Sequence, residues 1–366
     1  MIRVLQCVND MHRAGLETML MNYYRNIDRT KIQFDFLTHR PYKSDYDDEI
    51  ISLGGKIYYA PRLYPQNYPK YFKWMEQFFR EHPEYKIVHS HIDAMSYLPL
   101  KAAKKAGIPV RIAHSHNTSI DKDFKYFLKQ YFRARINSVT TDFCACGKEA
   151  GKFLFGDVDY TIIPNAIDAS SFLYNPTIRE RKRLELQIKN EFVIGHVGRF
   201  SYQKNHNLLI KIFNQYMYVN PNAILLLVGV GEKEKEIRKQ VAELGLNEKI
   251  RFLGNREDVN ELYQAMDIFL MPSFFEGVPV VGVEAQFADL PCIFSDKVPR
   301  EVKFCEKTEF VDLKAPIERW IEVIEKNRKI DRKSVADELE KSMYNIKQAH
   351  LFLEQYYLKM MCREEI

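Results

Sequence analysis

The chain has 366 residues, of which 46% are hydrophobic, and a formal net charge of +5. This length predicts two domains, and no apolar run reaches the roughly 18 residues that a membrane-spanning helix needs. The modest positive charge suits an anionic small molecule or an anionic membrane surface, and the lack of a DNA- or RNA-binding motif argues against nucleic acid. The six cysteines are scattered, which favours free thiols in a reducing cytoplasm over disulfides or a zinc site. The N-terminal segment becomes polar too soon for a secretory signal.

The first part of the chain alternates predicted strands and helices, beginning with a strand over residues 1–8. The loop at residues 9–17 contains Gly15 and runs into a helix, which is where doubly wound sheets bind phosphates. This loop has no G-x-G-x-x-G sequence, so the dinucleotide-binding fingerprint is absent. A plain tight turn at Gly15 is the alternative.

Two further predicted strands, within residues 87–91 and 111–117, both end in His-Ser-His. Ligands of parallel sheets bind at the carboxyl ends of strands. The candidate site residues at these ends are His89, His91, His114 and His116. No cysteine or acid nearby completes a usual zinc-ligand spacing, so we expect no metal there. Hydrogen-bonded loop histidines are the alternative.

Residues 120–137 interleave lysines and arginines with aromatic residues, among them Lys122, Phe124, Lys125 and Lys129. This pattern is typical of a helix that lies on anionic lipid. It is equally compatible with a helix that packs one face on the core and exposes a basic face to water.

The second half of the chain repeats the strand–loop–helix pattern. Residues 192–200 read as a buried strand that enters a loop with Arg199 and Lys204. Residues 223–231 predict a strand followed by a glycine turn that suits a nucleotide, and residues 250–256 predict another strand and loop.

The most informative stretch is residues 266–296, which reads as strand, loop, helix and strand. Glu276 lies in the loop and Glu284 in the helix; along a helix they would be roughly 12 Å apart, about the span from sugar to ribose in a nucleotide sugar. Free backbone N–H groups at the helix start form an anion site, and Gly277 lets a phosphate approach the backbone. On spacing alone, two ordinary surface glutamates are the alternative.

Three sequence blocks resemble the retaining glycosyltransferases of family 4. They are P-S-x-x-E-G-x-P-x-x-x-x-E-A at residues 272–285, V-G-R-F-S-x-x-K-N at 197–205, and I-P-N-A-I-D at 163–168. The resemblance implies the GT-B fold, an α/β architecture of two Rossmann-like, doubly wound domains that face each other across a cleft. It implies an N-terminal acceptor domain (1–168), a C-terminal donor domain (169–340) and a C-terminal helix (341–366) that returns to the first domain.

The same resemblance assigns roles to single residues. His116 would lie beside the reacting sugar, as a base or only as a positioning group, and Glu276 would contact the sugar near its reacting carbon. Glu284 would bind the ribose, while Arg199 and Lys204 would hold the diphosphate. The other positions expected to contact the donor are Gly15, Arg256, Gly277 and Val278.

The resemblance implies retaining transfer of a hexose from a nucleoside diphosphate sugar, expected to be UDP-linked, to a hydroxyl group. The expected acceptor is a lipid-linked or other oligosaccharide of capsule or another surface polysaccharide, which fits a peripheral position on the inner face of the plasma membrane. We expect no metal or other cofactor, because Arg199, Lys204 and the helix start can neutralise the diphosphate. The alternatives are a GT-B-like nucleotide-sugar epimerase and a non-catalytic nucleotide-sugar binding protein.

Overall fold

The computed structural model describes residues 1–120, 125–332 and 342–362. The chain forms two compact units: unit 1 comprises Met1–Ala166 and Met343–Ile366, and unit 2 comprises Ile167–Ser342. These limits lie two residues from the domain boundaries expected after residues 168 and 340.

Unit 1 is built on a seven-stranded sheet of order β3-β2-β1-β4-β5-β6-β7, in which neighbouring strands pair in parallel. The strands are β1 (Ile2–Val8), β2 (Ile32–Thr38), β3 (Ile57–Tyr59), β4 (Ile87–Ser90), β5 (Val110–Ser115), β6 (Asp142–Ala145) and β7 (Thr161–Ile162). The strand order reverses between β1 and β4. The carboxyl ends of these two strands are therefore where such a sheet binds ligands.

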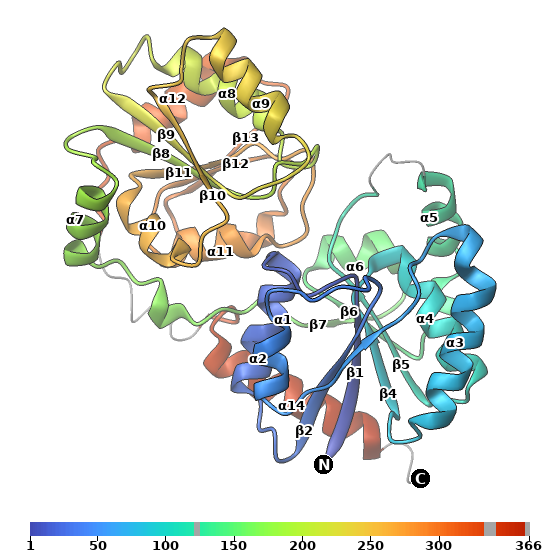
Figure 1. Ribbon diagram of the computed structural model, residues 1–366. Coiled ribbons are helices and arrows are strands. Elements are labelled where there is room, and N and C mark those ends of the chain that lie inside the picture. The colour runs from blue at the N-terminus through green and yellow to red at the C-terminus, as the bar shows by residue number, and fades with distance from the viewer. Residues whose placement is uncertain (121–124, 333–341, 363–366) are drawn as a thin grey trace. The chain divides into compact units, whose positions relative to one another are not determined.

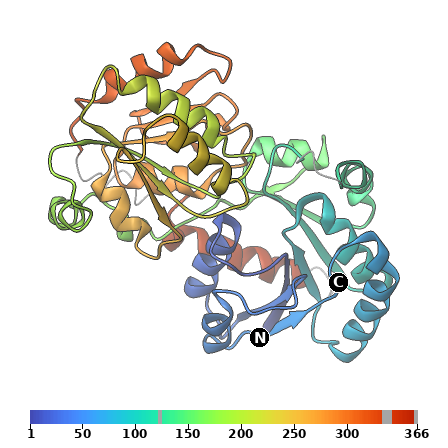
Figure 2. The same ribbon diagram turned by 45° about the horizontal axis from the view of Figure 1, so that its top comes forward.

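The helices of unit 1 cover both faces of its sheet. They are α1 (Gly15–Asn26), α2 (Asp47–Ser52), α3 (Tyr68–Glu81), α4 (Tyr97–Lys105), α5 (Tyr126–Arg133), α6 (Lys148–Phe155) and α14 (Ile346–Cys362). Figure 1 shows α3 and α4 on one face and α1 with α14 on the other. In both views the red helix α14 lies beside the blue helix α1 (Figures 1 and 2), and Glu354 of α14 accepts a hydrogen bond of 2.7 Å from the backbone N–H of Asp28. The last helix of the chain therefore belongs to unit 1.

Unit 2 is built on a six-stranded parallel sheet of order β10-β9-β8-β11-β12-β13. Its strands are β8 (Phe192–Val197), β9 (Ala223–Val228), β10 (Ile250–Gly254), β11 (Ile268–Met271), β12 (Cys292–Ser295) and β13 (Thr308–Val311). Its helices are α7 (Pro176–Glu185), α8 (His206–Tyr216), α9 (Glu234–Glu243), α10 (Val259–Ala265), α11 (Val280–Phe287) and α12 (Ile317–Asn327). Single turns of 3₁₀-helix occupy Pro65–Asn67, Asp93–Ser96, Ile136–Ser138, Ala169–Ser171 and Arg300–Val302.

The core of unit 2 explains why its strands are almost wholly apolar. Helices α8, α9 and α12 cover one face of the sheet, and α10 and α11 cover the other (Figure 1). A parallel strand between two helical layers buries both of its faces, and all six residues of β9 are buried. Leu209 and Phe213 of α8 pack with the fully buried Trp320 of α12 in the cluster on the first face.

The helix expected over residues 120–137 is shorter than predicted. Helix α5 has eight residues, and the chain then enters the turn at Ile136–Ser138. Arg133 donates a hydrogen bond to the carbonyl of Phe153, and Ile136 is fully buried, so packing ends the helix where the charge pattern alone would continue it. Lys122 and Phe124 lie outside the described residues. Among the residues that are described, no helix is both long and apolar enough to cross a membrane.

Candidate active site

The loops that follow β8 and β11 meet at the centre of the unit 2 sheet. These strands are neighbours, and the strand order reverses between them, which is where doubly wound sheets bind ligands. The backbone N–H of Phe274 donates to the carbonyl of Gln203 at 2.8 Å, and Asn205 Nδ2 donates to the carbonyl of Pro272 at 3.1 Å. The two sequence blocks that carry the family resemblance therefore form one site in unit 2.

The contact between Lys204 and Glu276 is the central feature of this site. Lys204 Nζ lies 2.7 Å from Glu276 Oε1, and Gln203 Nε2 donates to the other carboxylate oxygen at 3.1 Å. Glu276 is 4% exposed, so its charge is held by these donors rather than by bulk water. Gln203 also donates to the carbonyl of Phe275. In the sequence, only its position next to Lys204 indicates that Gln203 belongs to the site.

Glu284 is buried within helix α11, which follows the loop that carries Glu276. Only 7% of the surface of Glu284 is exposed, and this burial raises the pKa of its carboxyl group to about 7. The hydroxyl group of Tyr263 on α10 donates to Glu284 Oε2 at 2.9 Å and partly offsets that shift. Tyr263 carries no signal of this role in the sequence, because nothing in its own segment points to a partner on another helix.

A glycine turn after β9 packs closely against the loop that carries Arg199. Gly229 has a φ of +129°, and a Cβ atom there would lie 2.3 Å from the carbonyl oxygen of Gly198. A Cβ atom on Gly231 would lie 2.5 Å from the carbonyl oxygen of Phe200. Both positions therefore require glycine for the close approach of the two loops.

The remaining donor positions expected in unit 2 differ in their surroundings. Arg199 is largely exposed and lies 3.2 Å from Glu232. Gly277 and the buried Val278 precede α11, which begins at Val280, so Glu276 lies in the loop and a helical spacing does not describe its separation from Glu284.

Arg256 is held by acidic side chains of unit 2. Its Nε and Nη2 atoms donate to the two carboxylate oxygens of Asp258 at 2.7 and 2.6 Å, and Glu185 lies 3.5 Å away. A nucleotide would have to compete with Asp258 for this guanidinium group.

In unit 1, the predicted residues Gly15 and His116 lie at the carboxyl-end side of the sheet. Gly15 is the exposed first residue of α1, which follows β1. His116 directly follows β5; its Nε2 atom lies 3.0 Å from His91 Nδ1, and its backbone N–H donates to Asp93 at 2.8 Å. Burial lowers the pKa of His116 to about 3, so its imidazole is neutral.

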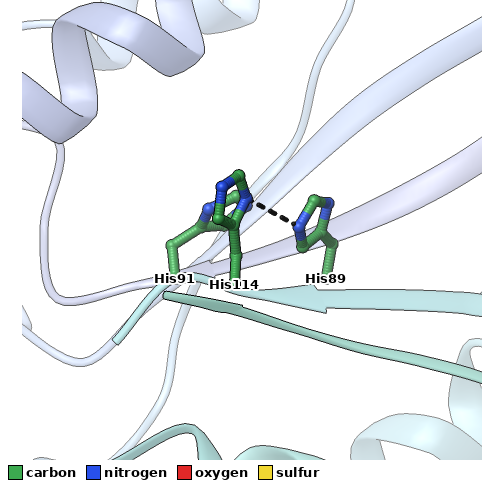
Figure 3. Close-up of side chains that lie close together, drawn as sticks. All are labelled: His89, His91 and His114. Atoms are coloured by element: carbon green, nitrogen blue, oxygen red, sulfur yellow. Dashed lines mark hydrogen bonds between the residues drawn. The ribbon is translucent and has the colours of Figure 1, made fainter. Parts of the chain in front are cut away.

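The other three histidines of the two His-Ser-His segments form a buried group. The candidate ligand atoms of His89, His91 and His114 all lie within 4.8 Å of one another, and Figure 3 shows the three rings with the hydrogen bond between His89 and His114. The His89 and His91 rings are tilted with centroids 4.2 Å apart, and the His114 and His116 rings stack at 4.1 Å. Ring nitrogens of this group are engaged in hydrogen bonds, His89 Nε2 with His114 Nδ1 at 3.1 Å and His91 Nδ1 with His116 Nε2 at 3.0 Å.

The chain is similar in sequence to known proteins, and this similarity identifies its family. The chain is 37% identical to EpsF of Bacillus subtilis (strain 168) over 332 residues, which cover 88% of this chain and 86% of that protein. The family profile described as Glycosyl transferases group 1 matches residues 178–326, and the profile described as Glycosyltransferase Family 4 matches residues 13–171. The chain belongs to glycosyltransferase family 4.

Two other similar proteins bear on this glycosyltransferase. The UDP-Gal:alpha-D-GlcNAc-diphosphoundecaprenol alpha-1,3-galactosyltransferase of Escherichia coli is 28% identical over 226 residues, 58% of each chain. The crystal structure of HepE from Anabaena in complex with UDP and glucose superposes with a TM-score of 0.77 at 17% identity and covers 99% of this chain and 100% of that one. At this identity the likeness shows the fold alone, and that fold is the expected GT-B.

Proposed function

We propose that this glycosyltransferase moves a hexose from a UDP-linked donor to a hydroxyl group of a lipid-linked or other oligosaccharide, with retained anomeric configuration, in surface polysaccharide synthesis. The observation that carries the proposal is the buried contact between Lys204 and Glu276 at the point in unit 2 where the strand order reverses. The name of the Escherichia coli relative and the ligands of the HepE structure support UDP and a hexose as the donor.

Lys204 and Glu276 suit the two ends of the bond that breaks. Cleavage of a glycosyl phosphate bond builds negative charge on the departing diphosphate, and fixed cations stabilise that charge. Lys204 and Arg199 supply two cations, and the backbone N–H groups at the start of α11 supply further donors. A bound diphosphate would draw Lys204 away from Glu276, which frees the carboxylate to accept hydrogen bonds from sugar hydroxyls.

Glu284 is suited to the ribose. A carboxylate offers two acceptor oxygens, and Tyr263 occupies one of them. The ionised form of Glu284 could therefore accept from ribose hydroxyls while Tyr263 holds the side chain in place. The neutral imidazole of His116 could likewise accept the proton of the acceptor hydroxyl or position that group.

The proposed function includes transfer without a metal ion and contact of α5 with an anionic membrane. Lys204 and Arg199 take the place of a divalent metal at the diphosphate, so transfer needs no metal ion. On α5, Phe127 is 86% exposed and Tyr131 is 50% exposed beside the basic residue Arg135. Exposed aromatic rings beside basic side chains suit the surface of an anionic membrane, where a lipid-linked acceptor resides.

A transfer assay tests this function against its alternatives. The enzyme is incubated with a panel of UDP-hexoses, with and without polyprenyl-diphosphate-linked N-acetylhexosamine, and products are followed by proton NMR. The proposal predicts acceptor-dependent release of UDP and a new α-glycosidic bond from an α-linked donor. Conversion of the donor without acceptor would indicate an epimerase, and binding without any turnover would indicate a binding protein. Lys204→Met is the matched inactive control.

A further inference from the structure

Two aromatic side chains stack on each other in the two loops that carry Lys204 and Glu276. Tyr202 lies two residues before Lys204 in the loop after β8, and Phe274 lies two residues before Glu276 in the loop after β11. The two rings have their centroids 4.7 Å apart and their planes inclined by 19°. This aromatic pair is therefore built on the same loops as the residues proposed for the diphosphate and the hexose.

Gln203 fixes the aromatic pair relative to Glu276. Its backbone carbonyl accepts the N–H of Phe274 at 2.8 Å. Its side-chain amide donates to the carbonyl of Phe275 at 3.0 Å and to Glu276 Oε2 at 3.1 Å. Gln203 directly follows Tyr202 in the chain, so both members of the pair are tied to the carboxylate through one residue. A surface that is held in this way loses little conformational freedom when a ligand binds to it.

Tyr202 presents an open aromatic surface at this fixed position. The partly buried Phe274 stacks on its ring, yet 57% of Tyr202 is exposed. Among the residues that the structure describes, Phe274 provides the only ring contact to Tyr202, and no hydrogen bond engages the Tyr202 hydroxyl group. Single exposed aromatic rings are common on protein surfaces. This one differs because it is attached to the loops that hold Glu276, and its ring and hydroxyl group are both available to a ligand.

The place of the aromatic pair favours a sugar ring over the nucleotide as its ligand. Gln203, which follows Tyr202, contacts Glu276, the residue proposed for the transferred hexose. Glu284, the residue proposed for the ribose, is instead contacted by Tyr263 on α10. The pair therefore adjoins the hexose end of the proposed donor site. A pyranose suits such a surface, because its C–H face packs on an aromatic ring while its hydroxyl groups hydrogen-bond around the edge.

Burial distinguishes the acceptor sugar from the donor hexose as the occupant of this surface. Glu276 is almost fully buried, whereas most of Tyr202 faces solvent. The acceptor must come from solvent to within bonding distance of the hexose at Glu276, so its sugar passes the exposed ring. We infer that Tyr202, supported by Phe274, stacks on the pyranose ring of the acceptor that carries the attacking hydroxyl group. This inference rests on the proposed function and adds to it a residue of unit 2 that selects the acceptor.

Two variants and one matched control test the inference in the full-length protein. Tyr202→Ser removes the ring, and Tyr202→Phe keeps the ring but removes the hydroxyl group. The control is Tyr218→Ser, because Tyr218 is another exposed tyrosine of unit 2. Transfer from an active UDP-hexose to polyprenyl-diphosphate-linked N-acetylglucosamine gives the KM for the acceptor, and calorimetry gives the Kd of UDP and of the UDP-hexose. Saturation-transfer NMR with a panel of methyl hexopyranosides, in the presence of UDP, detects sugar contact without turnover.

Tyr202→Ser should raise the KM for the acceptor about fivefold or more, abolish the NMR signal of the hexopyranosides, and leave both Kd values within about twofold. Tyr202→Phe should keep the NMR signal, and Tyr218→Ser should behave as the wild type does.

Three results would overturn the inference. Weaker binding of UDP to Tyr202→Ser would assign the ring to the base, and weaker binding of the UDP-hexose alone would assign it to the donor hexose. An acceptor KM and an NMR signal that both match the wild type would leave the ring without a ligand. If the wild type transfers no sugar from any donor, the proposed function fails, whereas loss of the NMR signal in Tyr202→Ser would still support a pyranose at Tyr202.

Discussion

Lys204 Nζ lies 2.7 Å from Glu276 Oε1, which joins two loops that are 72 residues apart in the chain. Both side chains are largely buried, at 14% and 6% exposure. The free protein thus pairs the two charges that the proposed function assigns to the diphosphate and to the sugar.

Removal of one partner of this pair should destabilise unit 2. Lys204→Met removes the cation that lies 2.7 Å from the buried carboxylate of Glu276, and we expect the free energy of unfolding to fall by about 3 kcal/mol. The double variant Lys204→Met/Glu276→Gln also removes the carboxylate charge and should recover most of that loss. Urea denaturation of both variants and of Glu276→Gln measures the difference. A double variant as unstable as the sum of the single changes would contradict the coupling.

The affinity for a nucleotide sugar should depend on pH through Glu284. Burial raises the pKa of this carboxyl group to about 7, so it is protonated below that pH and ionised above it. Only the ionised group offers all its oxygen lone pairs to the ribose, and the affinity should therefore rise by about tenfold between pH 6 and pH 8. Calorimetry with UDP-glucose is the measurement, because its diphosphate does not titrate in this range.

Glu284→Gln is the control for that pH dependence. Its affinity should be constant across the same range, and a slope that persists in this variant would assign the titration to another group. The free protein should show the opposite trend in stability. A carboxyl pKa raised from 4.5 to about 7 favours the folded state at low pH, and this contribution is lost as the pH rises through 7.

Transfer should be independent of divalent metal ions. Lys204 and Arg199 are the cations assigned to the diphosphate, so EDTA should leave the rate of transfer within about twofold. The assay follows UDP release before and after dialysis against the chelator. Loss of activity that Mn²⁺ or Mg²⁺ restores would show that a metal performs this task instead.

The exposed aromatic side chains of α5 should contribute to membrane binding. Phe127→Ser/Tyr131→Ser should reduce co-sedimentation with phosphatidylglycerol vesicles by at least about half, because these rings are the apolar part of the surface. Tyr218→Ser in unit 2, at a residue that is 79% exposed, is the matched control and should sediment as the wild type does. Equal sedimentation of all three proteins would remove the membrane part of the proposal.

The architecture could be predicted where local signals and apolar runs agree. The strand at Ile268–Met271 and the helix at Val280–Phe287 follow from a short apolar run, a loop with glycine and proline, and a second apolar stretch. The predicted helix over residues 120–137 was too long, because charge patterning does not reveal that Ile136 packs into the core.

The partners within each site could not be predicted from local sequence. His89 and Tyr357 are 268 residues apart, and only the folded sheet brings α14 over the strand that carries His89. Tyr263 is similar, since its helix pattern indicates burial but not that its hydroxyl reaches Glu284. The sequence blocks pointed to the charged residues of the proposed donor site, whereas the side chains that contact them could be found only in the structure.

The most direct test of the donor site is calorimetry of UDP and a panel of UDP-hexoses with the wild type, Glu276→Ala and Glu284→Ala. Glu284→Ala should weaken the binding of every ligand, UDP included, on the order of tenfold or more. Glu276→Ala should leave UDP binding within about threefold while it removes discrimination among the sugars. If both variants bind every ligand as the wild type does, Glu276 and Glu284 do not hold the donor, and the proposed site is wrong.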